Sequence, residues 1–487
     1  MSTHAQLTPE AARILHNQRK QSIIASLFIA ILTIALVSTL FTFLLVKGLT
    51  LTPPKLIIQP STSKADPPPQ PQPTPTSIQK KPSTPRQAAI PTIIAQAFSP
   101  TSIPVVEITT PTLSAELGNN ADIGIGWNGN GQGGPTKDIP SPLRKRCSAA
   151  DRLQRLADNG GNEACEASVT KALHWLKTHQ NKNGSWGNQK PVAMTGLALL
   201  SFLGHCEDPS SIEYGAAVTD GILYLLDNSL KQNGKCASDL KDKHWCYEHA
   251  IAVYALSESY LFCKGLNTEF ASEIKEATRT GTQWIIDNQT EAGGWDYGYA
   301  SDGRPGDSSI VAWHLQALKA ASLTGIRFPK LKKTIGNGLE FLAGCQNENG
   351  GFGYTLNKKP VGGAKGHFSL TGAGALCFQQ HKGSSNSNAR KGIRYLSQNT
   401  RFDFAAGEVN LYEHYYASQA FINHSGQEWR TYNGIVRDQL LKHQNKDGSW
   451  PNTRGPGSHS DPVYSTVLAT LMLEVYYRYL PGTSTSR

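Results

Sequence analysis

A ten-residue phrase occurs twice in this chain. HQNKNGSWGN at positions 179–188 returns as HQNKDGSWPN at positions 443–452, with eight of ten residues identical and 264 residues between the two starts. Its core is a Gln, three residues, a Gly, any residue and an aromatic, and this core occurs four times, each time between two apolar runs of helical spacing. Repetition on this scale indicates an array of equal units. The core residues are Gln180, Gly184, Trp186, Gln289, Gly293, Trp295, Gln346, Gly350, Phe352, Gln444, Gly448 and Trp450.

The spacing of the phrase predicts the number of units. Successive aromatics lie 109, 57 and 98 residues apart, so the outer gaps are near twice the middle one. Two degenerate copies fill them: GILYLLDNSLKQNGKC before WCYEHAIAVYAL, and GIRYLSQNTRFDFAAG before LYEHYYASQAF. Each helix pair leaves an apolar face that only a neighbour can bury. We therefore expect an all-α fold over 145–481: an (α/α)6 toroid whose inner helices line a central cavity.

The phrase itself suits a structural role. Gly184 and its equivalents permit a tight turn with positive φ after a helix. The Gln amide can bond backbone groups left without partners at helix ends, and the aromatic can bury area between adjacent pairs. No side chain in the Gln-Gly-aromatic core titrates, so we place no catalytic function in it.

The phrase is similar to the QW repeats of the terpenoid cyclase and protein prenyltransferase superfamily, over about 166–481. The resemblance implies an α/α toroid. Squalene-hopene cyclases protonate an alkene with an Asp-x-Asp-Asp-Thr cluster, whereas the similar stretch RPGDSSIVAW keeps only Asp307. Prenyltransferases bind zinc through an Asp, a Cys and a His. LYEHYYASQA places His414 at the His position, but the preceding GHFSLTGAGALCF begins with neither Asp nor Cys. The Gly-Cys-Gly-Glu-Gln sequence of complement-like thioester domains is absent.

Functional residues are expected where the inner helices begin, because ligands favour concave sites and helix N-termini favour anions. Two inner helices begin with Tyr-Glu-His. The acid-base candidates are Asp307, Glu413, His414, Glu248 and His249. The ligand-binding candidates are Tyr247, Trp313, His314, His367, Tyr412, Tyr415, Tyr416 and Tyr464. The competing interpretation is that the Glu-His pairs cap helices and bond to their neighbours.

We predict no cofactor and no metal site. The alternative left open is an unorthodox zinc site around His249, His367 and His414, since a catalytic zinc needs at least three protein ligands.

The N-terminal part predicts a tether. Residues 21–46 carry no charge, and about 20 apolar residues suffice to cross a bilayer as a helix. We expect a cytoplasmic tail (1–21), a membrane helix (22–46), a disordered Pro- and Gly-rich linker (47–144), the toroid (145–481) and a disordered tail (482–487). Arg13, Arg19 and Lys20 precede the span, which favours a cytoplasmic N-terminus and an extracytoplasmic toroid, periplasmic if the source is bacterial.

The net charge argues against one class of partner, and the cysteine count permits disulfides. The net charge of +10 is scattered, with no basic helix face, so we expect no nucleic-acid partner. The eight cysteines permit disulfides in an exported domain, and Cys236 and Cys246 are near enough in sequence to close a small loop. Cys377 lies in an apolar run and reads as a buried small hydrophobe.

Three functions are compatible with these residues. The first is a membrane-tethered binding or scaffold module for a lipid, an isoprenoid, a peptide or an envelope partner. The second is an enzyme of the cyclase or prenyltransferase type, acting on an isoprenoid or glycan. The third is a structural subunit of an envelope assembly.

Overall fold

The computed structural model describes residue 143 and residues 145–266, 270–300, 303–356, 366–404, 409–453 and 461–478. The chain divides into two units, Met1–Thr112 and Leu113–Arg487, and every described residue belongs to the second. The predicted tails, membrane helix and nearly all of the linker therefore lie outside the described residues. No helix within the described ranges is both long and apolar enough to cross a membrane.

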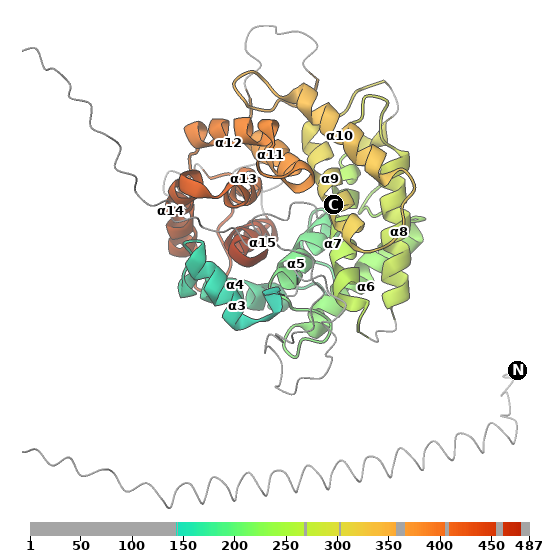
Figure 1. The fold of residues 1–487 in the computed structure, drawn as a ribbon. Coiled ribbons are helices and arrows are strands. Elements are labelled where there is room, and N and C mark those ends of the chain that lie inside the picture. The colour runs from blue at the N-terminus through green and yellow to red at the C-terminus, as the bar shows by residue number, and fades with distance from the viewer. Residues whose placement is uncertain are drawn as a thin grey trace, which may run out of the picture. The chain divides into compact units, whose positions relative to one another are not determined.

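Helices α4 to α15 form a closed ring with two layers (Figure 1). Each inner helix contacts the next, and α15 contacts α5, which closes the ring. The predicted six helix pairs are present, and the described residues contain isolated β-bridges but no strand. The inner helices are α5 (Pro191–Gly204), α7 (Trp245–Cys263), α9 (Ser308–Leu323), α11 (Phe368–Lys382), α13 (Leu411–His424) and α15 (Pro462–Leu473). The outer helices are α4 (Glu163–Thr178), α6 (Gly215–Lys231), α8 (Ala271–Asp287), α10 (Leu331–Cys345), α12 (Ser387–Asn399) and α14 (Gly426–His443).

The two layers differ in sequence as their burial requires. Inner helix α5 reads PVAMTGLALLSFLG and is buried from Val192 to Gly204, because neighbours surround it. Its small residues allow close approach: a Cβ on Gly196 would lie 2.8 Å from Cγ2 of Ile251 in α7. Outer helix α12 buries only one face, through Ala389, Gly392, Ile393 and Leu396. Short elements at the two described ends of the chain complete the unit: η2 (Lys145–Cys147), α3 (Ala149–Asp158) and α16 (Val475–Arg478). A further short helix, η3 (Tyr297–Tyr299), lies between α8 and α9.

Each copy of the phrase joins one outer helix to the next. The Gln180 amide donates to the carbonyls of Gly184 and Ala217, both at 2.9 Å, and Ala217 lies in α6. The Trp186 indole donates back to the carbonyl of Leu176 at 2.7 Å and is fully buried. Gln289, Gln346 and Gln444 each make the same two amide bonds.

The glycine of the phrase acts as a wedge between outer helices. Gly184 has φ +84°, and a Cβ there would lie 2.4 Å from the Asp220 carbonyl oxygen of α6. Gly293, Gly350 and Gly448 rest in the same way on α10, α12 and α4. The last contact, together with the bond from Gln444 to the Ser168 carbonyl, joins the sixth unit to the first. The phrase therefore spaces and links the outer layer.

The cysteines pair differently from the loop suggested by sequence proximity. Cys147 and Cys206 form a disulfide across 59 residues. Cys236 and Cys246 are free and buried, so the small loop between them is not closed. Cys377 is buried, as expected for a small hydrophobe.

Candidate functional site

Asp307 lies at the centre of a hydrogen-bonded group where the inner helices begin. It caps α9: its Oδ1 accepts from the Ser309 backbone N–H at 2.8 Å and from the Ser309 hydroxyl at 2.5 Å. The Tyr297 hydroxyl donates to Oδ2 at 3.3 Å, and the Tyr247 hydroxyl lies 2.7 Å from Ser309 Oγ. Side chains from α7, η3 and α9 thus converge on one carboxyl group.

Burial and hydrogen bonding act in opposite directions on the pKa of Asp307. Burial raises the pKa of Asp307 above its usual value, and the bonds from Ser309 and Tyr297 offset part of that rise. Burial also raises the pKa of Tyr247, and the charges of Tyr412 and Asp307 raise it further, so its hydroxyl remains protonated.

A second carboxyl lies nearby. Glu413, in the first turn of α13, is half-buried, and burial raises its pKa. Tyr354 is 48% exposed. Burial raises its pKa, and the charges of Asp307 and Glu413 raise it further. We call this end of the ring, with Tyr247, Tyr297, Asp307, Ser309, Tyr354 and Glu413, the open end.

Four of the predicted ligand-binding aromatics form one cluster beside it. Trp313 stacks on Tyr415 with ring centroids 5.6 Å apart, and Tyr416 contacts Trp313, Tyr412 and Tyr415. Tyr415 and Tyr416 have no exposed surface and Trp313 has 2%, so these rings fill the interior of the ring. Tyr412 is half-buried. Tyr464 is 8% exposed, and burial, followed by the charge of Tyr412, raises its pKa. Within the cluster, only Tyr412 has appreciable surface for a ligand.

The two Glu-His pairs do not converge on Asp307. His249 accepts at Nδ1 from the Cys236 N–H at 3.0 Å and donates from Nε2 to the Gly281 carbonyl at 3.1 Å. His414 bonds the Tyr432 hydroxyl at 3.0 Å and the Arg401 carbonyl at 2.8 Å. Burial lowers both pKa values to about 4, so both rings are neutral and both are fully engaged. Among the described residues, no hydrogen bond or ion pair joins any two of the five acid-base candidates.

The repeated His has a structural explanation that the sequence pattern did not reveal. In three of the four copies that keep the phrase, the backbone N–H of the aromatic donates to a threonine in the following inner helix, as Trp186 does to Thr195 at 3.0 Å. Phe352 and Trp450 bond Thr371 and Thr466 in the same way. In the two degenerate copies, His249 and His414 occupy this position and hold the altered loops.

The remaining predicted residues are placed as follows. Glu248 is buried, accepts from the Ser238 N–H and hydroxyl, and lies 3.7 Å from Lys190; burial raises its pKa. His314 accepts from the Tyr299 hydroxyl at 2.7 Å and stacks on Trp295, and burial lowers its pKa to about 3. His367 is exposed, with its ring 4.8 Å from that of Tyr354.

The zinc alternative finds no ligand set in the part of the chain that the structure describes. His249 and His414 use both ring nitrogens in hydrogen bonds, which leaves neither free to bind a metal. No group of three His, Cys, Asp or Glu there could hold an ion.

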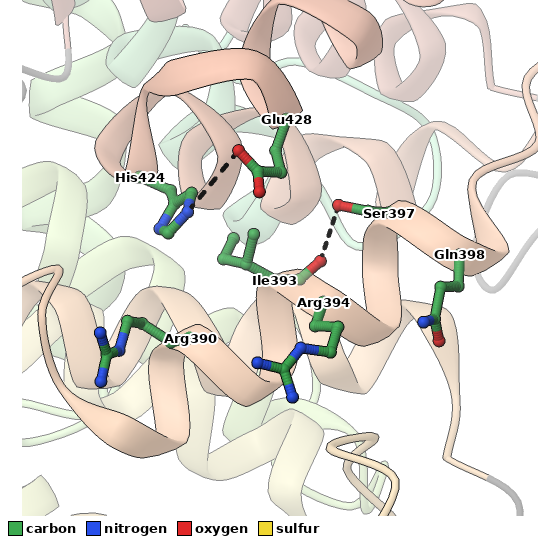
Figure 2. Close-up of a pocket in the computed structure, with 7 residues that line it drawn as sticks. All are labelled: Arg390, Ile393, Arg394, Ser397, Gln398, His424 and Glu428. Atoms are coloured by element: carbon green, nitrogen blue, oxygen red, sulfur yellow. Dashed lines mark hydrogen bonds and ion pairs between the residues drawn. The ribbon is translucent and has the colours of Figure 1, made fainter. Parts of the chain in front are cut away.

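The two best-formed pockets among the described residues lie outside the ring centre. One, of about 320 Å³, is bordered by α12 and α14 (Figure 2), and an adjoining one has about 240 Å³. The expected central cavity is not one of these, because aromatic side chains occupy the ring interior.

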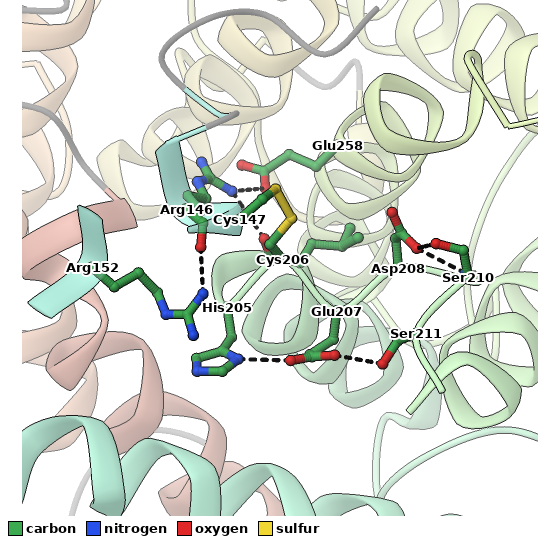
Figure 3. Close-up of a disulfide and its surroundings, with 11 residues drawn as sticks. Arg146, Cys147, Arg152, His205, Cys206, Glu207, Asp208, Ser210, Ser211 and Glu258 are labelled. Atoms are coloured by element: carbon green, nitrogen blue, oxygen red, sulfur yellow. Dashed lines mark hydrogen bonds and ion pairs between the residues drawn. A yellow bond between two sulfur atoms is a disulfide. The ribbon is translucent and has the colours of Figure 1, made fainter. Parts of the chain in front are cut away.

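The opposite end of the ring is closed by buried charges (Figure 3). Glu258 of α7 accepts from Arg146 at 3.1 Å and pairs with Arg478 at 3.3 Å. The Arg146 guanidinium also bonds the Arg478 carbonyl at 3.3 Å, joining η2 to α16. Beside it, Glu474 has no exposed surface, and its carboxylate lies 3.8 Å from Arg478. We call this group, with the Cys147–Cys206 disulfide, the sealed end.

A second ion-pair group extends the sealed end. His205 lies 3.1 Å from Glu166 and 2.8 Å from Glu207, and Arg152 lies 2.7 Å from Glu166. Despite the opposing effect of burial, the two carboxylates raise the pKa of His205, and His205 and Arg152 lower that of Glu166 to about 2. Glu166 lies 39 residues before His205, and residue patterns did not identify this group.

Comparisons with known proteins give structural similarities only. No family model and no curated protein matches the chain. An inactive α-1,6-mannanase variant of Salegentibacter sp. HEL1_6, in complex with α-1,6-mannotriose, is 10% identical with a TM-score of 0.48, over 64% of this chain and 99% of that one. The apo type II terpene cyclase MstE from Scytonema is 9% identical with a TM-score of 0.39, and the match covers 65% of this chain and 98% of the cyclase. A protein from Actinoplanes is 14% identical with a TM-score of 0.40, and the match covers 65% of this chain and 100% of the Actinoplanes protein. Similarity at this level assigns neither an activity nor a substrate to this chain.

Proposed function

We propose that the ring is a binding module that takes a hydroxyl-rich ligand, such as an oligosaccharide, at the open end. The observation that carries this is the convergence of Tyr247, Tyr297 and Ser309 on the half-buried Asp307. A carboxyl flanked by hydroxyls both accepts and donates hydrogen bonds, which suits a sugar's hydroxyl groups. The half-exposed ring of Tyr354 offers an apolar face for the ligand to rest on.

An isoprenoid or lipid in the ring centre is less well supported. A long apolar ligand needs an apolar cavity, and aromatic rings with 2% exposure or less fill the interior. The polar open end favours a ligand with hydroxyl groups instead.

We further propose that the module is held outside the cytoplasm by a membrane helix at residues 22–46, with a Pro-rich arm between. The uncharged run from 21 to 46 supports the anchor. The Cys147–Cys206 disulfide supports an oxidising compartment, because disulfides are rare in cytosolic proteins.

Binding is tested with the full chain in detergent. It would be titrated with α- and β-linked oligosaccharides and monitored by intrinsic fluorescence. We expect one class to bind, Asp307→Asn to lower its affinity about tenfold through a lost charge-assisted bond, and Tyr247→Phe to lower it less. Glu340→Gln removes an exposed carboxyl on α10 and serves as the control, with unchanged affinity. The proposal fails if no oligosaccharide binds, or if Glu340→Gln weakens binding as much as Asp307→Asn.

The second candidate is a glycan-cleaving enzyme that uses Asp307 and Glu413. The specific observation is that burial raises the pKa of both carboxyls, and that the charges of both raise the pKa of Tyr354. Glycosidases pair a carboxylic acid with a carboxylate across the scissile bond. Release of reducing sugar from a bound oligosaccharide, abolished by Glu413→Gln while binding persists, would establish it. Binding without any turnover would exclude it.

A further inference from the structure

A groove runs between outer helices α12 and α14, on the outside of the ring. Its first part, about 320 Å³, lies between Arg390 and Arg394 on one wall and His424 and Glu428 on the other (Figure 2). Its second part, about 240 Å³, is lined by Phe421, Tyr432 and Ile435 among others. Ser397 and Glu428 line both parts, so the two are continuous.

The groove lies at a unit whose described residues include no glycine wedge. Elsewhere the turn glycine rests on the first half of the next outer helix: Gly184 on α6, Gly293 on α10 and Gly350 on α12. In the second degenerate copy, which precedes α14, no glycine among the described residues rests on α14 in this way. Its loop is held instead by Gln439, which bonds the Phe402 carbonyl and the Phe404 N–H farther along α14. The first half of α14 is thereby left to line the groove.

The two arginines of the groove have no partner of their own. Arg390 and Arg394 are one helical turn apart on α12, and both are exposed. Neither makes a hydrogen bond or an ion pair with any residue that the structure describes. Glu428 lies 3.9 Å from His424 and leaves both guanidiniums uncompensated. Two arginines side by side match a carboxylate, because guanidinium and carboxylate form paired hydrogen bonds.

The second part of the groove is apolar at its floor. Phe421 and Tyr432 are nearly fully buried beneath it, and Ile435 stands at its edge with 39% of its surface exposed. A free inorganic anion would make no favourable contact with this apolar part, whereas a peptide could place an apolar side chain on it.

We propose that the α12–α14 groove binds an acidic peptide segment of a partner protein. One Asp or Glu of the partner lies between Arg390 and Arg394, and an apolar side chain a few residues away rests against Phe421 and Ile435. This site is separate from the open end and does not depend on the ligand proposed there.

The test uses fluorescein-labelled nine-residue peptide pools and the full chain in detergent. The first pool carries one Glu and one Leu, one to four residues apart, in a Gly-Ser background. A second pool has Gln in place of Glu, and a third has Ser in place of Leu. Binding is measured by fluorescence anisotropy at low ionic strength, and the wild-type chain is expected to prefer the first pool.

Matched variants separate the groove from general charge. Arg390→Gln with Arg394→Gln should lower affinity for the first pool about tenfold or more, through two lost charge-assisted contacts. Lys332→Gln with Lys333→Gln removes the same charge from exposed positions on α10 and should leave affinity within about twofold, since distant surface charges are screened. Ile435→Ser should lower affinity for the first pool to that for the Ser pool. The exposure of Arg390 and Arg394 makes their variants tolerable for folding, which a thermal melt verifies.

Three outcomes would overturn the proposal. The wild-type chain could bind the Glu and Gln pools equally. The lysine pair could lose as much affinity as the arginine pair, which would indicate general electrostatics. Inorganic phosphate could displace the first pool while Ile435→Ser changes nothing, which would indicate a simple anion site.

Discussion

Glu258 at the sealed end and Asp307 at the open end are held in opposite ways. At the sealed end, Glu258 is held between Arg146 and Arg478, and the charges of the two arginines lower its pKa despite full burial. At the open end, Asp307 is half-buried among hydroxyls, without a cationic partner among the residues that the structure describes, and burial raises its pKa.

Because of this difference, we assign stability to the sealed end and ligand binding to the open end. Breaking the buried ion group of the sealed end is costly, because removing one partner leaves a buried charge uncompensated. A carboxyl with a raised pKa and an accessible phenol beside it is typical of a site that binds or transfers protons. The sealed end should therefore dominate the free energy of unfolding, and the open end should dominate ligand binding.

The largest expected effect is at Glu258. Glu258→Gln leaves two buried guanidiniums without their anion and should cost about 3–5 kcal/mol of unfolding free energy. Urea denaturation at pH 7 measures it. Glu276→Gln, which breaks an exposed pair with Arg279, should cost less than about 1 kcal/mol. Equal costs for the two variants would remove the distinction between the ends.

The disulfide should have the next effect. Cys147→Ser with Cys206→Ser opens a loop between residues 59 apart in sequence. We expect a loss of about 2–4 kcal/mol, chiefly because the unfolded chain is no longer constrained. Dithiothreitol should lower the wild-type stability by the same amount and leave the double variant unchanged. An effect of reductant on the double variant would point to another thiol.

Glu474 should make stability depend on pH. Burial raises its pKa to about 8, although Arg478 opposes the rise. Because the folded-state pKa lies above the usual 4.5, the stability this group contributes is present at low pH and is lost as the pH rises to about 8. Glu474→Gln cannot titrate, so relative to the wild type it should gain on the order of 1–3 kcal/mol between pH 5 and pH 8. Urea denaturation of both proteins across this pH range measures the difference. If the unfolding free energies of the wild type and Glu474→Gln changed with pH in parallel, Glu474 would be ionised throughout, contrary to the prediction.

The smallest effect on stability should be at Asp307. Asn caps a helix about as well as Asp, so Asp307→Asn should change the unfolding free energy by less than about 1 kcal/mol. The raised pKa of Asp307 means that its ionised form is disfavoured by folding, so removing the charge should not destabilise the chain at neutral pH. A loss as large as that of Glu258→Gln, in the same urea assay, would make Asp307 a structural residue.

The ring could be predicted from sequence because its units repeat at a readable spacing. The phrase and its two degenerate copies identified the six helix pairs, since Gln, Gly and the aromatic each have a local geometric role. The sealed end could not be predicted, because Arg146 and Arg478 are 332 residues apart and no pattern links them.

The candidate site was only partly predictable. Asp307 was identified at a helix start, but its partners Tyr297 and Ser309 were not, although both lie within ten residues of it. The repeated Tyr-Glu-His drew attention to His249 and His414, whose repetition reflects a common structural position. Repetition in this chain marks what holds the ring together, and the unrepeated aspartate marks the open end.

The central claim is that ligand binds at the open end and leaves the sealed end unchanged. Hydrogen–deuterium exchange of the full chain, with and without the best-binding oligosaccharide, tests it most directly. We predict slower exchange in peptides that contain Tyr297, Asp307 and Glu413, and no change in those that contain Glu207 and Arg478. Protection confined to the sealed end, or to the α12–α14 groove, would contradict the account.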